Sequence, residues 1–321
     1  MIKYKSYFLL ILLLACFSCE KDNLLNKYAD YSEHYDDNET SSPFFINNPL
    51  PSERDTLRIL SLGNSFAMNA LTYLPNVLSS NGVSSKRYSL YLVAKSACSL
   101  EQYAEILYKA SSISLSKDDD IVLYYMGGDE MDCCKGRTSI GIEELIGQPW
   151  DIITLQQYSA LATDYNSFNP YLRYLIKRIR QLCTNPNVTL AWHQAWSYNS
   201  DYGDSPYGIN RYNLISRAML QMVQQDGINI IIPSGTAVQN YRISSICGPD
   251  EGTVDGVHLN DVTKYLVSFV WYKSLFRDML IKETDSLALH PFPDEFDDKT
   301  VGILNKCADD AIRFPFWVTS Q

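Results

Sequence analysis

The sequence predicts a three-layer α/β/α domain, because short apolar runs alternate with segments of helical periodicity from Leu57 onward. Runs such as 58–62 (RILSL) and 228–233 (INIIIP) are apolar at nearly every position, which is typical of strands buried on both faces of a parallel sheet. Between such runs, apolar residues recur at every third or fourth position. Helices of this kind cover both faces of a parallel sheet.

Five runs are predicted to form the parallel strands, and they span residues 58–62, 88–93, 151–156, 188–193 and 228–233. The helical patterns between the later strands are carried by Tyr171, Leu175, Ile179 and Leu182, and by Tyr212, Ile215, Met219 and Met222. The last predicted helix carries Val262, Tyr265, Leu266, Phe269 and Val270. The segment 118–149 contains a strand-like run, a turn-rich acidic loop and a short helix. We interpret it as an insertion between the second and third strands.

The N-terminus has the pattern of an export signal, with two Lys followed by an apolar run from Tyr7 to Phe17 that is too short to span a bilayer. Residues 1–18 resemble a bacterial lipoprotein signal, and Cys19 is predicted to carry the lipid because the small Ser18 precedes it. Residues 19–56 are polar and are expected to form a tether to a folded domain at 57–321. We therefore expect an exported protein, lipid-anchored at a bacterial membrane. The alternatives are an ordinary secreted protein or an uncleaved anchor.

Charge and cysteine content exclude several functional classes. The net charge is −10 and there is no basic run, so nucleic acid is not an expected partner. Beyond Cys19 the six cysteines are too sparse for a disulfide-built scaffold, and they are Cys98, Cys133, Cys134, Cys183, Cys247 and Cys307. Neither CxxC spacing nor a neighbouring His accompanies the adjacent pair, so no metal site is predicted.

The segment SLGNSF (61–66) places a Ser at the turn between a strand and a helix. In open parallel sheets, ligands bind beyond the carboxyl ends of the strands, so the Ser65 hydroxyl is placed like a nucleophile. Gly63 permits a tight backbone, and Asn64 is predicted to fix the turn or to contact substrate. Ser also caps helices at such positions, and this stretch alone favours neither role.

A nucleophilic Ser needs a general base, and the chain contains four His. His34 lies in the tether and His290 in a loop late in the chain. His193 ends the fourth strand, where it is predicted either to line the crevice and contact substrate or to be buried. His258 follows Asp255 by three residues, a spacing that lets the carboxylate orient one ring nitrogen while the other faces a hydroxyl.

Five ordered segments together resemble the SGNH hydrolase superfamily, also called GDSL esterases, and most closely an exported subfamily. They are LGNSFA (62–67), SACSLEQY (96–103), WDIITLQQYS (150–159), IIPSGTAVQN (231–240) and DGVHLN (255–260). The resemblance implies a flavodoxin-like α/β/α fold. It also implies that Ser65 is the nucleophile, His258 the general base and Asp255 its orienting partner.

The resemblance further implies an oxyanion hole, in which the family uses a Gly and an Asn as donors. This chain has Ala97 at the Gly position, and the Asn function would fall to Gln156 or Gln157. Loss of one such donor costs about 10²–10³ in rate. Trp196 is predicted to flank the crevice, where it could stack on a sugar ring or belong to the core.

The predicted function is that of a serine esterase without a cofactor, acting on a small ester or on O-acetyl groups of a glycan. The alternative is a non-catalytic, glycan-binding surface lipoprotein that keeps the fold. A third hypothesis is an interaction scaffold that uses the acidic segment 118–149. The presence of Ser65, Asp255 and His258 favours the enzyme, whereas Ala97 and the missing Asn favour the binding protein.

Overall fold

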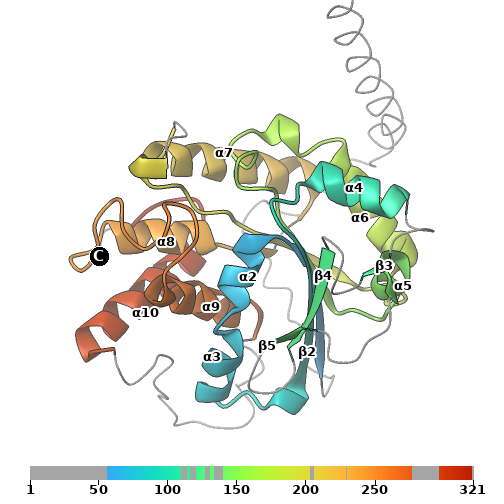
Figure 1. Cartoon of the computed structure of the whole chain (residues 1–321), viewed down its shortest axis with the longest axis horizontal. Coiled ribbons are helices and arrows are strands. Elements are labelled where there is room, and N and C mark those ends of the chain that lie inside the picture. The colour runs from blue at the N-terminus through green and yellow to red at the C-terminus, as the bar shows by residue number, and fades with distance from the viewer. Residues whose placement is uncertain are drawn as a thin grey trace, which may run out of the picture.

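A computed structural model shows a central sheet with helices on both sides, which confirms the predicted α/β/α class (Figure 1). The structure describes residues 56–109, 114–115, 121–126, 131–133, 140–202, 206–228, 230–276 and 296–319. The predicted signal and residues 19–55 of the predicted tether lie outside the described residues. Cys19, His34 and His290 are therefore also outside them.

The main sheet has the strand order β5-β4-β2-β1-β7-β8-β9. Its strands are β1 (Leu57–Gly63), β2 (Tyr88–Lys95), β4 (Ile121–Met126), β5 (Met131–Cys133), β7 (Ile152–Leu155), β8 (Thr189–His193) and β9 (Ile230–Ile232). The neighbours from β2 to β9 pair in parallel, and these are the five predicted strands. A second, two-stranded sheet pairs β3 (Ser114–Leu115) with β6 (Ile140–Gly141).

The segment interpreted as an insertion contributes an edge to the main sheet. Strand β4 pairs antiparallel with β2, from Leu90 opposite Met126 to Lys95 opposite Ile121, and β5 pairs antiparallel with β4. The short helix α5 (Ile142–Ile146) follows before β7. The sheet thus has seven strands: the five from β2 to β9 are parallel, and β4 and β5 add an antiparallel edge beside β2.

Alternate residues of β1 enter two separate cores, as the period of two along a strand requires. Leu57 and Ile59 pack into one core, whereas Leu60 and Leu62 pack into the other. The first core is covered by α2 (Ser65–Leu71), α3 (Leu74–Ser80), α8 (Ser234–Arg242), α9 (Asp261–Leu275) and α10 (Asp298–Arg313). The second is covered by α4 (Leu100–Tyr108), α5, α6 (Tyr171–Leu182) and α7 (Gly208–Asp226).

The prediction that the helix after 261 is the last one was wrong, because α10 follows it. The apolar face of α10 includes Val301, Leu304, Ala308 and Ala311, which are all buried in the first core against α8 and α9. These positions have the spacing of one helix face. The helix therefore belongs to the folded domain and completes one of its two covering layers.

Two further properties concern the described residues only. Cys98, Cys183, Cys247 and Cys307 are free thiols, and burial raises the pKa of the Cys98 thiol to about 12 despite the opposing charge of Lys95. None of the helices in these parts of the chain has the length and apolar character needed to cross a bilayer.

The strand order places a topological switch point between β1 and β7. From β1 the chain continues to β2 on one side, and it later returns to β7 on the other side. Open α/β sheets bind ligands beyond the carboxyl ends of the strands at such a point. Ser65 follows β1 and Gln156 follows β7, so both lie at this end of the sheet.

Candidate active site

Asn64 holds the turn that carries Ser65. Its Oδ1 accepts a hydrogen bond from the Phe66 N–H at 3.0 Å, which caps α2, and its Nδ2 donates to the Cys98 carbonyl at 3.1 Å. The side chain is 2% exposed. The expected contact between Asn64 and substrate is therefore corrected, because both ends of its amide serve the turn and the neighbouring loop.

Gly63 allows helix α2 to start directly against the end of β1. A Cβ at this position would lie 2.4 Å from the Ala67 Cβ and 3.2 Å from Leu92 Cδ1, so no larger residue fits without movement. The Tyr103 hydroxyl lies 2.6 Å from the Gly63 carbonyl oxygen and 2.8 Å from that of Val93. The backbone that presents Ser65 is thus fixed from two sides.

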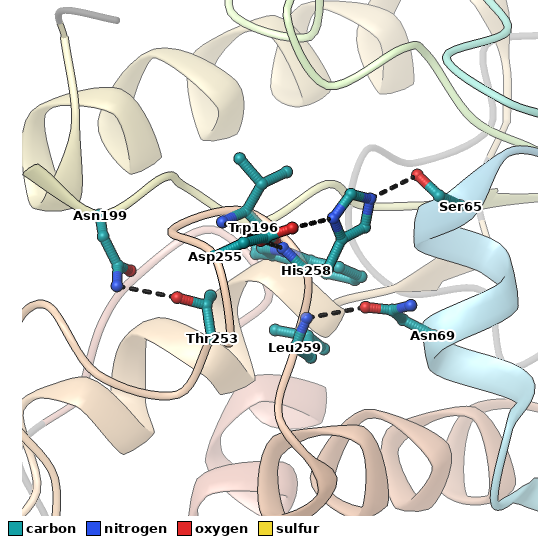
Figure 2. A network of polar contacts seen from close by, with 9 residues as sticks. Ser65, Asn69, Trp196, Asn199, Thr253, Asp255, His258 and Leu259 are labelled. Atoms are coloured by element: carbon teal, nitrogen blue, oxygen red, sulfur yellow. Dashed lines mark hydrogen bonds and ion pairs between the residues drawn. The ribbon is translucent and has the colours of Figure 1, made fainter. Parts of the chain in front are cut away.

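The structure brings together the three side chains predicted as nucleophile, base and orienting acid (Figure 2). Ser65 Oγ lies 3.2 Å from His258 Nε2, although the two residues are 193 positions apart in the chain. His258 Nδ1 lies 2.7 Å from Asp255 Oδ2. This is the order of contacts that a Ser-His-Asp triad requires.

The other carboxylate oxygen of Asp255 holds the turn that carries His258. Asp255 Oδ1 accepts backbone hydrogen bonds from Val257 at 3.0 Å and from His258 at 2.6 Å. Partial burial tends to raise the pKa of Asp255, but the hydrogen bonds from His258 and Val257 outweigh it and leave that pKa below its usual value. The Asp255 carboxylate therefore stays ionised and oriented.

Asn69 and Trp196 connect the helix of Ser65 with the segment of His258 (Figure 2). Asn69 Oδ1 accepts from the Leu259 N–H at 2.7 Å. Trp196 Nε1 donates to the Val257 carbonyl at 2.7 Å, and its ring stacks on Phe66 with centroids 3.8 Å apart. Trp196 is 0% exposed, so the alternative in which it belongs to the core holds and the expected sugar contact is corrected.

A buried arginine joins the two loops beneath this site. The Arg242 guanidinium donates to the carbonyls of Ser197 at 2.9 Å and Glu251 at 3.1 Å, and also to the Asn199 side chain. Desolvation lowers the pKa of Arg242 to about 10. Asn199 in turn donates to Thr253 Oγ1 at 2.8 Å (Figure 2). The segment that leads to Asp255 is therefore anchored to the loop after β8.

Ala97 adopts the left-handed backbone conformation, with φ at 51°. This is the region that Gly enters freely and that a Cβ disfavours. Ala97 is exposed, and the Cys98 carbonyl that follows is bound by Asn64. The chain thus keeps a Gly-like backbone at the position where the resemblance implies a Gly.

Gln157 is excluded as the second oxyanion donor. Its Oε1 accepts from the N–H groups of Leu100 at 3.0 Å and Tyr158 at 2.8 Å. Its Nε2 donates to the carbonyl and the hydroxyl of Ser167 at 2.9 and 3.2 Å. Because the whole amide is used within the protein, the expectation for Gln157 is corrected to a structural role.

Gln156 differs from its neighbour, because its amide nitrogen is buried without a hydrogen-bond partner. Its Oε1 lies 2.8 Å from His193 Nδ1, and His193 Nε2 lies 3.0 Å from Ser234 Oγ. His193 is 2% exposed, and burial lowers its pKa to about 3, so the ring is neutral. The alternative in which His193 is buried therefore holds, and its expected contact with substrate is corrected.

Within the described residues, no group of three or more His, Cys, Asp or Glu side chains is arranged to hold a metal ion. Sequence reasoning missed Asn69. Its signal was its position one helical turn after Ser65, which places it on the same face of α2.

The structure is similar to that of a DUF4886 family protein from Bacteroides uniformis ATCC 8492, with 26% identity and a TM-score of 0.68 over 83% of this chain and 98% of that chain. A GDSL-like lipase candidate from Parabacteroides merdae ATCC 43184 has 12% identity and a TM-score of 0.45, over 69% and 96% of the two chains. A Bacillus subtilis protein has 13% identity and a TM-score of 0.41, over 68% and 56%.

A search of curated proteins finds no match to this chain. The family model described as "Domain of unknown function (DUF4886)" matches residues 58–302, which is most of the chain and nearly all of the folded domain. The chain belongs to the DUF4886 family.

Proposed function

We propose that the protein is a serine ester hydrolase in which Ser65 is the nucleophile. The observation that carries this proposal is the continuous contact from Ser65 Oγ through His258 to Asp255, at 3.2 and 2.7 Å. Because Asp255 accepts the Nδ1 proton of His258, Nε2 is left free to accept the proton of Ser65.

The reaction follows from these contacts in two steps. Ser65 Oγ attacks the ester carbonyl while His258 Nε2 takes its proton, and the same proton then passes to the departing alcohol. Water next attacks the acyl-serine, with His258 again accepting and returning a proton, so that the acid is released and Ser65 is restored. Asp255 stabilises the imidazolium in both steps without being protonated itself.

We extend the proposal to O-acetyl groups on carbohydrate as the substrate class. The side chains of His258 and Asp255 are 40% and 50% exposed, so the described residues leave the site open to a bulky, polar leaving group. The resemblance to an exported subfamily of SGNH hydrolases supports the same class. A lipid on Cys19 would hold such an enzyme at a membrane surface.

A second candidate function is glycan binding without catalysis. The observation that favours it is the altered oxyanion region, with Ala97 at the Gly position and Gln157 committed to Ser167. An oxyanion hole with a missing donor loses about 10²–10³ in rate. Whether Ser65 reacts is therefore the property that separates the two candidates.

The deciding experiment measures p-nitrophenyl acetate hydrolysis by the purified protein and by its Ser65→Ala variant. Ser79→Ala is the matched control, because Ser79 is an exposed serine on α3. Loss of turnover in Ser65→Ala alone supports the hydrolase. Equal background rates from all three folded proteins would contradict it and favour the binding protein, which is then tested for affinity toward acetylated glycans.

A further inference from the structure

The strongest anomaly next to the candidate site is the unpaired amide nitrogen of Gln156. A buried donor without a hydrogen-bond partner is destabilising, so a folded protein rarely keeps one without a reason. Ser61 pairs in parallel with Thr154, and the same register extended by two residues places Gln156 beside Gly63, two residues before Ser65. A Cβ on Gly63 would lie 3.6 Å from Gln156 Oε1, which confirms this closeness.

The orientation of this amide is set from behind by two buried side chains. His193 Nδ1 lies 2.8 Å from Gln156 Oε1, and Ser234 Oγ lies 3.0 Å from His193 Nε2. The three side chains are 3%, 2% and 0% exposed, in the order Gln156, His193 and Ser234. A neutral ring with its proton on Nδ1 donates to Gln156 Oε1 and accepts the Ser234 hydroxyl proton on Nε2.

We infer that His193 and Ser234 are positioning residues that hold the Gln156 amide as the side-chain donor to the oxyanion formed at Ser65. This inference rests on the proposed esterase function. Its structural basis is the chain of contacts from Ser234 through His193 to Gln156, which ends in a donor with no partner at the switch point between β1 and β7.

The chemistry explains why an unpaired donor is useful at this place. During attack by Ser65, the carbonyl oxygen of the ester gains negative charge, and a hydrogen bond to it becomes much stronger than one to the ground state. An amide already paired within the protein, as in Gln157, would lose one bond to form another. The amide of Gln156 gains a bond only when the oxyanion forms.

The carbonyl of Gln156 must point toward His193 for this purpose. If the amide were reversed, its oxygen would face the developing negative charge and would repel it. With its proton on Nδ1, the His193 ring requires an acceptor at this 2.8 Å contact and so holds the Gln156 carbonyl in this direction. The role of His193 is thus exerted through Gln156 and not by contact with substrate.

The test compares kcat and KM for p-nitrophenyl acetate in four variants. Gln156→Met keeps the length of the side chain without its donor, and we expect kcat to fall about 10²–10³-fold with KM little changed. For His193→Leu we expect a loss of about tenfold or more in kcat. His193→Asn places an amide N–H where Nδ1 was, so it should recover most of that loss. In the double variant Gln156→Met/His193→Leu, kcat should equal that of Gln156→Met alone.

Gln194→Leu is the matched control, because Gln194 directly follows His193 in the chain and is 0% exposed. Its amide binds Thr236 and Ser216, away from Gln156, so this variant should lose stability and keep kcat. Should His193→Leu fail to fold, Ser234→Ala is the milder change, and it should lower kcat in the wild-type background but not in Gln156→Met.

Two results would overturn the inference while Ser65 remains reactive. One is an unchanged kcat in folded His193→Leu. The other is that His193→Leu lowers kcat by the same factor in the wild-type protein and in Gln156→Met. Labelling of Ser65 by a fluorophosphonate distinguishes these two results from failure of the proposed function, because it reports whether Ser65 is reactive. If wild-type Ser65 neither reacts with the probe nor turns over ester, the esterase proposal fails and the inference falls with it.

Discussion

Asn69 lies one helical turn after Ser65 on α2 and accepts a hydrogen bond from the backbone N–H of Leu259 at 2.7 Å (Figure 2). Leu259 follows His258 directly. The same face of one helix therefore presents the hydroxyl to the imidazole and fixes the backbone next to that imidazole. We therefore expect this second contact to help set the distance from Ser65 Oγ to His258 Nε2.

Removing the acceptor should slow the reaction without removing any reacting group. In Asn69→Ala we expect kcat for p-nitrophenyl acetate to fall about tenfold to a hundredfold, because small displacements of a base are costly. Asn69→Asp keeps an acceptor and should retain most activity. Asn76→Ala on α3 is the exposed control. An unchanged kcat in folded Asn69→Ala would contradict the positioning role.

Asp255→Asn should harm the site through the tautomer of His258. Asp255 Oδ1 accepts two backbone N–H groups, so the oxygen of an Asn side chain would remain there. The new NH₂ group would then face Nδ1 and force the ring proton onto Nε2, which could no longer accept the Ser65 proton. We expect kcat to fall about 10²–10⁴-fold with the fold intact.

The control for this change is Asp261→Asn, since the Asp261 side chain is 70% exposed and pairs with Lys264 outside the triad. Steady-state rates and circular dichroism of both variants decide the matter. If Asp255→Asn and Asp261→Asn retain the same activity, the orienting role of Asp255 is wrong.

The left-handed backbone of Ala97 allows a test of the loop around Ala97, where the resemblance implies an oxyanion donor. Ala97→Gly removes a strained Cβ at φ 51° and should raise the free energy of unfolding by up to about 1 kcal/mol, with kcat equal or higher. Ala97→Val places a β-branched side chain there and should lower both stability and kcat. Because Ala97 is exposed, burial does not confound the comparison. Urea unfolding and ester turnover of both variants are the measurements, and a Val variant equal to wild type would refute the strain argument.

Much of the fold could be predicted because apolar runs and helical periodicity are local properties. The five parallel strands follow directly from runs such as 58–62 and 228–233. The pairing of 121–126 with β2 could not be predicted, because register and edge position depend on tertiary packing. Helix α10 was not predicted, although the spacing of its apolar residues can be read from the sequence.

The residues of the candidate site were likewise predicted only in part. Ser65, Asp255 and His258 were found from turn chemistry and spacing, and they lie in contact, while their catalytic role stays a prediction. The choice between Gln156 and Gln157 required Ser167, which occupies one amide and not the other. Sequence alone does not show which side of a strand end each side chain takes.

His193 gives the last prediction, which concerns stability at acid pH. Burial lowers its pKa to about 3 in the folded protein, against 6.5 for an unperturbed His. Below the unfolded value, the unfolded chain therefore binds a proton that the folded protein does not, so acidification favours unfolding. The free energy of unfolding should fall by about 1 kcal/mol for each pH unit lost between about pH 6.5 and about pH 4.5.

His193→Asn has no titrating group at this position. The slope of its free energy of unfolding against pH should therefore be smaller by about 1 kcal/mol per pH unit in this window. Urea unfolding of the wild type and this variant across the same window measures the difference between the two slopes, in which contributions shared by both proteins cancel. Parallel curves would mean that His193 binds its proton in the folded protein. The ring could then not act as the neutral donor and acceptor between Ser234 and Gln156.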